Sequence, residues 1–155
     1  MRLMGSLNMM QGLFQPLHLL LILVIGVLVM GPWIIYIPRL QRALERCSPA
    51  SRTMSPGKVW LLLIPLFNDI WHFYVVSNLA RSLGNEFKSR DVLNADSEPG
   101  KSLGFAMCIL FVCSFIPKIG LVLWLAGIVC WIVYWVKIEG YSRILSTPYE
   151  AGKTI

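Results

Sequence analysis

Residues 16–37 form a run of 22 residues without a formal charge, rich in Leu, Ile and Val. A helix of about 20 apolar residues crosses the roughly 30 Å hydrocarbon core of a bilayer, so this run is long enough for one span. It is longer than the roughly 7–15 apolar residues of a secretory signal peptide, and no small-residue cleavage site follows it. We therefore expect a retained membrane-spanning helix.

The composition of the whole chain favours the same environment. Of the 155 residues, 56% are hydrophobic and 14% are charged, whereas soluble domains average about 45–50% apolar and about 25% charged. One small core has no room for this excess, which in water would lie exposed in large patches. The net charge of +6 is spread over the polar segments. This distribution fits contact with anionic lipid better than a nucleic-acid groove, so no nucleic-acid partner is expected.

Three further apolar segments follow the first. The segments 102–116 and 119–138 are separated by Pro117-Lys118, which predicts a tight helical hairpin. The segment 59–80 is interrupted at Pro65 and contains an Asp, which costs about 2.5 to 3.5 kcal/mol at a helix centre, while each Leu returns only about 0.3–0.6. We expect a single all-α integral membrane domain over 1–155, with three spans and a second segment that is broken, re-entrant or interfacial.

Lys and Arg are unevenly distributed among the polar segments. Five lie in 38–58, four in 81–101 and three near the C-terminus, which leaves Arg2 and Lys118. If 59–80 spans completely, the two sides of the membrane carry 6 and 8 of these residues; if it enters and leaves on one side, they carry 2 and 12. Cytoplasmic loops collect Lys and Arg, so the second arrangement is favoured, with 38–58 and 81–101 as cytoplasmic loops.

The stretch after the first span predicts a second, short helix. Gly31-Pro32 loosens or ends the first helix, and Pro38 restrains the chain again. Leu40 and Leu44 then stand four residues apart, with the charged residues of 39–47 in other directions. This pattern indicates an amphipathic helix at the membrane interface; the alternative is a solvated charged linker.

Asn68, Asp69 and His72 are the best candidates for a functional site. Their spacing places them on adjoining faces of one helical turn if the helix resumes after Pro65. An ionisable residue at membrane depth indicates a proton relay or polar ligand pocket. In the structural alternative, which we favour, Asn68 and Asp69 satisfy backbone groups released at the Pro65 helix break, while His72 reaches the interface.

Aromatic residues and a lysine near the ends of two segments are expected to anchor the protein at the lipid headgroups, because Trp and Tyr gather at that depth. These interface anchors are Trp60, Trp71, Trp131, Trp135 and Lys137.

No motif in the sequence calls for catalysis or a cofactor. We find no nucleophile-elbow, Walker, dinucleotide-binding or H-E-x-x-H pattern, and one His with one Asp is too small a set for a closed metal site. The four cysteines match no zinc or C-x-x-C spacing and are expected to pack as small apolar residues. We therefore predict no enzyme, no catalytic residue, no metal and no cofactor.

Two stretches resemble known families. Phe14-Gln15-Pro16, His18 and Gly31-Pro32 lie in a stretch, 12–32, that resembles the N-terminal helix and hinge of the A-type component of the twin-arginine protein translocase. That family has a short membrane helix followed by an amphipathic helix on the cytoplasmic face. The resemblance implies a role in protein export.

The second resemblance covers about two thirds of the chain, from Leu40 to Leu145. The blocks 43–49, 52–57, 59–68 with its Pro-Leu-Phe-Asn core, and 131–137 are similar to a family of small uncharacterised bacterial multi-pass membrane proteins. This resemblance implies the bacterial cytoplasmic (inner) membrane and carries no activity with it.

From these features we expect a non-catalytic accessory or scaffolding subunit of a larger membrane protein complex. A chain this small has few helix faces for its own polar groups, so other membrane subunits or a second copy are expected partners beside the lipid bilayer. One alternative is a small oligomeric channel or transporter-like protein with a polar path at Asn68, Asp69 and His72. The other is a membrane component related to twin-arginine export.

Overall fold

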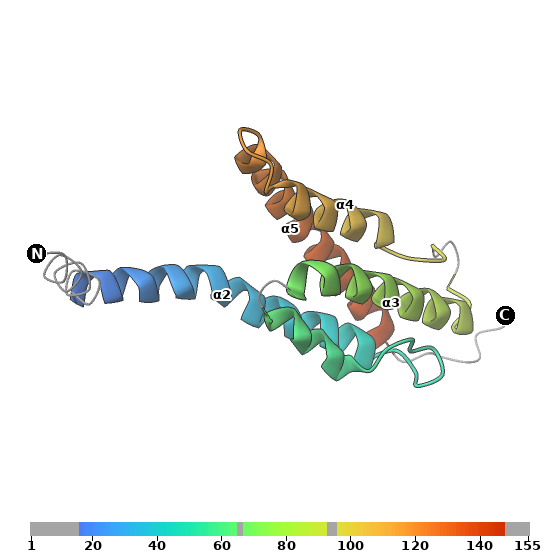
Figure 1. Cartoon of the computed structure of the whole chain (residues 1–155). Helices are drawn as coiled ribbons and strands as arrows, with labels where there is room; N and C mark the ends of the chain where they lie inside the picture. The colour runs from blue at the N-terminus through green and yellow to red at the C-terminus, as the bar shows by residue number, and fades with distance from the viewer. Residues whose placement is uncertain (1–15, 65–66, 93–95, 148–155) are drawn as a thin grey trace, which may run out of the picture. The chain divides into compact units, whose positions relative to one another are not determined.

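The computed structural model describes residues 16–64, 67–92 and 96–147. Every regular element in these ranges is helical, which confirms the predicted all-α class (Figure 1). The elements are α2 (Pro16–Glu45), the 3-10 helix η1 (Pro56–Leu63), α3 (Phe67–Ser89), α4 (Lys101–Cys113) and α5 (Gly120–Ser146). The chain divides into two compact units, 1–35 and 36–155, which we describe separately.

The first unit contributes the N-terminal part of α2. Every described side chain from Pro16 to Val27 is exposed, and all of these residues except His18 are non-polar. The most apolar stretches of α2 and α5 are both strongly hydrophobic, that of α2 more than that of α5. Within the described part of the chain, α2 and α5 are thus the helices long and apolar enough to cross a membrane, while α4, with 13 residues, is shorter.

The predicted span, 16–37, lies within a longer helix, and the separate short helix predicted after Pro38 is not formed. The helix continues through Pro32 and Pro38 to Glu45, without a separate second helix. A proline removes one backbone hydrogen bond, but packing of neighbouring residues outweighs that loss. Here the residues that share one helix face are fully buried in the second unit, so this face contacts protein and not a membrane surface. They are Tyr36, Ile37, Leu40, Ala43 and Leu44.

The second predicted segment is interrupted, as η1 ends at Leu63 and α3 begins at Phe67; Pro65 itself lies outside the described residues. The first part of the predicted cytoplasmic loop 81–101 is helical, because α3 continues to Ser89. The reason is a buried stripe at helical spacing that runs past residue 80. Its members are Val76, Leu79, Leu83 and Phe87.

Helices α4 and α5 pack against each other as a hairpin, and α4 also packs on α3 (Figure 1). The close approach requires a glycine: a Cβ at Gly104 would clash with Val76 and lie 2.9 Å from Cε2 of Tyr134. The last helix also extends beyond the predicted span, 119–138. α5 runs to Ser146 because Ser142 and Leu145 continue its buried face.

Candidate functional site

The three predicted site residues occupy the first two turns of α3. Asn68 and Asp69 are half-buried in the first turn, while His72 in the next turn is buried. The backbone N–H of Asn68 donates to the carbonyl of Ile64 at 2.9 Å, which bridges the end of η1 and the start of α3.

His72 joins α3 to α2. Its Nε2 lies 3.1 Å from Oη of Tyr36, a residue that is also fully buried. The Tyr36 ring makes edge contacts with the rings of Trp131 and Trp135 of α5, at centroid distances of 5.2 and 6.1 Å. We call these four residues the Tyr36 cluster. The predicted interfacial position of His72 is therefore wrong, since its ring lies inside the helix bundle.

Asn68 differs from His72 in its hydrogen bonding. Its side-chain Oδ1 is buried and has no hydrogen-bond partner among the described residues. Buried amide oxygens are rarely left unpaired, because desolvation of the group costs free energy that a hydrogen bond normally offsets. This oxygen is therefore able to accept a hydrogen bond from a polar ligand.

A second polar site, which the sequence interpretation missed, lies at the C-terminal end of α3. Glu86 is buried, and its Oε2 accepts hydrogen bonds from the backbone N–H and the hydroxyl of Ser48, both at 2.8 Å. Its Oε1 accepts from Nε of Arg90 at 2.8 Å. The Ser51 hydroxyl lies 3.0 Å from that of Ser48. We call Ser48, Ser51, Glu86 and Arg90 the Glu86 cluster.

The electrostatics of the Glu86 cluster favour a carboxylate that is charged at neutral pH. Burial by itself would raise the pKa of Glu86, but the hydrogen bonds from Ser48, Arg90 and Ser51 outweigh this and lower it to about 2. Both carboxylate oxygens are thus occupied by donors. The arrangement stabilises the fold and leaves little capacity for acid–base chemistry.

Arg90 and Arg46 extend this network to α5. Nη1 of Arg90 donates to the carbonyl of Leu145 at 3.0 Å, and Nη1 of Arg46 donates to the hydroxyl of Ser142 at 2.6 Å. The C-terminal ends of α2, α3 and α5 are therefore held together by arginine side chains. Arg90 stands four residues after Glu86, so the sequence contained a signal for that ion pair but none for its distant partners.

No protein-family model, curated protein or solved structure matches the chain.

The predicted interface anchors have different environments. Trp60 is exposed and donates from Nε1 to Oε1 of Gln41 at 2.6 Å, while Trp71 donates to the carbonyl of Lys58 at 3.0 Å. Lys137 is exposed. Trp131 and Trp135 are half-buried in the Tyr36 cluster, so part of each ring contributes to packing between helices.

The cysteines and acidic residues do not form a metal centre in the described part of the chain, where no three His, Cys, Asp or Glu side chains could share an ion. All four cysteines are free thiols. Burial, together with the nearby charge of Glu86, raises the pKa of Cys47 to about 12, so this thiol remains protonated near neutral pH.

Proposed function

We propose that this chain is a multi-pass membrane protein of the bacterial inner membrane and acts as a non-catalytic accessory or scaffolding subunit of a larger complex. The observation that carries the proposal is the exposed apolar surface of α2 between Pro16 and Val27. Burial of one large apolar side chain is worth about 1.5–3 kcal/mol, so a whole helix of this kind requires lipid or a partner helix around it. In a subunit of a membrane complex, this helix is surrounded by lipid and by partner helices.

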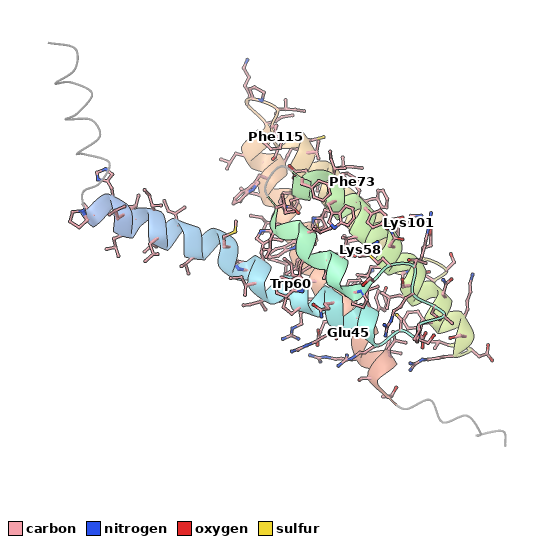
Figure 2. All side chains as sticks on the ribbon, turned by 60° about the horizontal axis from the view of Figure 1, so that its bottom comes forward. Glu45, Lys58, Trp60, Phe73, Lys101 and Phe115 are labelled. Atoms are coloured by element: carbon pink, nitrogen blue, oxygen red, sulfur yellow. The ribbon has the colours of Figure 1, made fainter. Side chains whose placement is uncertain are left out.

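The second unit supports the proposed orientation. In Figure 2, Phe115 at the turn between α4 and α5 lies at one end of this unit and Glu45 at the opposite end. The Phe115 end exposes large apolar side chains, with Phe115 and Leu121 more than two thirds exposed, beside one charged residue of the turn, Lys118. The Glu45 end carries the arginines that bind the ends of α2, α3 and α5. We place the Glu45 end in the cytoplasm, as the distribution of Lys and Arg favours.

The contact of His72 with Tyr36 supports a scaffolding role over a transport role. A buried imidazole that is hydrogen-bonded to a neighbouring helix contributes to helix packing, which is a structural role different from the interfacial one expected from the sequence. A channel or transporter-like function is a second candidate, favoured by the buried and unpartnered Oδ1 of Asn68. To test this candidate function, ion and proton flux in liposomes is compared between Asp69→Asn and the wild type. An unchanged flux would refute the channel or transporter-like function.

The membrane part of the proposal is tested by fractionation and labelling. The protein should pellet with membranes and resist extraction at high pH; recovery as a detergent-free monomer in the supernatant contradicts the proposal. Single-cysteine variants at the exposed residues Ser55 and Ser97 should resist an impermeant maleimide added to intact cells, while Lys118→Cys at the hairpin turn should react and serves as the positive control. Reaction at only one of the first two positions would show that 59–80 spans completely.

The subunit part is tested by affinity purification from native membranes in mild detergent, followed by mass spectrometry. A partner membrane protein at constant stoichiometry is expected. The variant Leu23→Asn, purified in the same way as the wild type, changes an exposed residue of α2. It should reduce the amount of partner protein recovered if that helix face binds the partner. Recovery of a homo-oligomer alone would refute the accessory role.

A further inference from the structure

The outward face of α5 carries a groove of about 500 Å³, a size typical of sites that bind small molecules. Its lining residues follow one stripe along the helix: Ile132, Trp135, Val136, Glu139, Gly140 and Arg143. The stripe changes character along its length. The first three residues present apolar or aromatic surface, and the last positions present charge.

The floor of the groove is open at Gly140, where a Cβ would meet nothing within 4 Å. Val136, one turn earlier, is 66% exposed. Nothing in the described part of the chain therefore covers the apolar part of the groove. An apolar surface at this position requires an occupant with an apolar portion.

The charged end of the groove is lined by one carboxylate, Glu139, and one guanidinium, Arg143. Glu139 forms an ion pair with Nη1 of Arg39 at 3.0 Å and a longer one, 3.5 Å, with Nε of Arg143. Glu139 is therefore neutralised mainly by Arg39, which does not line the groove, and Arg143 holds it only loosely. The Arg143 side chain is 76% exposed, so most of its donors remain available, and guanidinium donors match the oxygens of a phosphate.

The dimensions of the stripe match one leaflet of a bilayer. From Ile132 to Arg143 the helix rises about 16 Å, which is close to half of the roughly 30 Å hydrocarbon core. The apolar end would then lie at the depth of the acyl chains, and Arg143 would lie at the depth of the headgroups.

We propose that this groove binds one anionic glycerophospholipid, with its phosphate at Arg143 and an acyl chain along Gly140, Val136 and Ile132. The proposal rests on the proposed membrane location, since it places Arg143 at the cytoplasmic headgroups. It goes beyond general contact with lipid because it requires both a particular headgroup charge and an open groove.

The test measures lipid binding to the full-length protein in detergent by native mass spectrometry. The protein is titrated with phosphatidylglycerol and, separately, with phosphatidylcholine that carries the same acyl chains. We expect tighter binding of phosphatidylglycerol to the wild type, and about tenfold weaker binding to Arg143→Gln, the loss typical of one charge-assisted contact. Arg42→Gln removes an exposed arginine outside the groove and should bind like the wild type.

A second variant tests the apolar part of the groove. Gly140→Leu places a side chain in the open space, retains Arg143 and should weaken phosphatidylglycerol binding without lowering the melting temperature. If neither variant weakens binding, or if phosphatidylcholine binds as tightly as phosphatidylglycerol, the lipid site is refuted. Inorganic phosphate that binds as tightly as phosphatidylglycerol would also refute it, because the acyl chain would then contribute nothing.

The membrane location is tested separately by fractionation, so the two failures can be distinguished. A protein that pellets with membranes but does not select phosphatidylglycerol refutes only the lipid site. A protein that stays in the supernatant refutes the proposed function as well.

Discussion

Glu86 is the residue whose replacement should destabilise the fold most clearly. In Glu86→Ala, Ser48 and Arg90 lose the carboxylate that accepts their hydrogen bonds, while the Arg90 side chain remains only 22% exposed. Removal of one partner of a buried ion pair costs about 3–5 kcal/mol. We expect about 3 kcal/mol, because Arg90 keeps its hydrogen bonds to the carbonyls of Leu145 and Arg46.

The assay is thermal unfolding of the purified protein in mild detergent, followed by tryptophan fluorescence. A loss of about 3 kcal/mol corresponds to a fall in melting temperature of roughly 6–12 °C for a domain of this size. Glu45→Gln, which alters an exposed carboxylate at the end of α2, is the matched control and should change the melting temperature by less than about 2 °C.

The pH dependence gives an independent check on the same reasoning. The pKa of Glu86 is about 2 in the folded protein, against 4.5 ordinarily, so its contribution to stability is fully present above about pH 4.5 and declines as the pH falls toward 2. The difference in melting temperature between the wild type and Glu86→Gln should therefore shrink between pH 5 and pH 3. A difference that is absent at pH 7, or equal at pH 7 and pH 3, would refute the assignment of Glu86 as a buried, charged acceptor.

Three further predictions concern single positions. Gly104→Ala should destabilise the protein by about 1–3 kcal/mol, because its Cβ would clash with Val76. Gly140→Ala, with open space around it, should be neutral or stabilising. Equal melting temperatures of the two variants would contradict the close packing of α4. Tyr36→Phe removes the hydroxyl that contacts His72 and should lower the free energy of unfolding by about 1 kcal/mol in the same assay. Tyr74→Phe, which alters an exposed tyrosine, is the control and should not change this free energy measurably. Cys47, whose pKa is about 12, should react with maleimide at pH 8 only after the protein unfolds. Peptide mass spectrometry measures the labelled fraction, and rapid labelling of the folded protein would contradict the burial of this thiol.

The sequence by itself determined the helical class and the positions of the strongest apolar segments. Residues 16–37 carry no formal charge and residues 119–138 carry one, Lys137, and this long apolar composition predicts membrane-length helices. The break near Pro65 was equally visible, because a proline followed by Asn68 and Asp69 interrupts a helical pattern locally. Such features depend on neighbours in the chain, which is why local reasoning recovers them.

The tertiary structure decided where the helices end and what the polar residues do. α2 continues past Pro38 because Tyr36, Leu40 and Leu44 are buried in the second unit, and this burial outweighs the local preference of proline. His72 pairs with a residue 36 positions away, and Glu86 with one 38 positions away. No local pattern encodes contacts at such separations, because they exist only once the helices have packed.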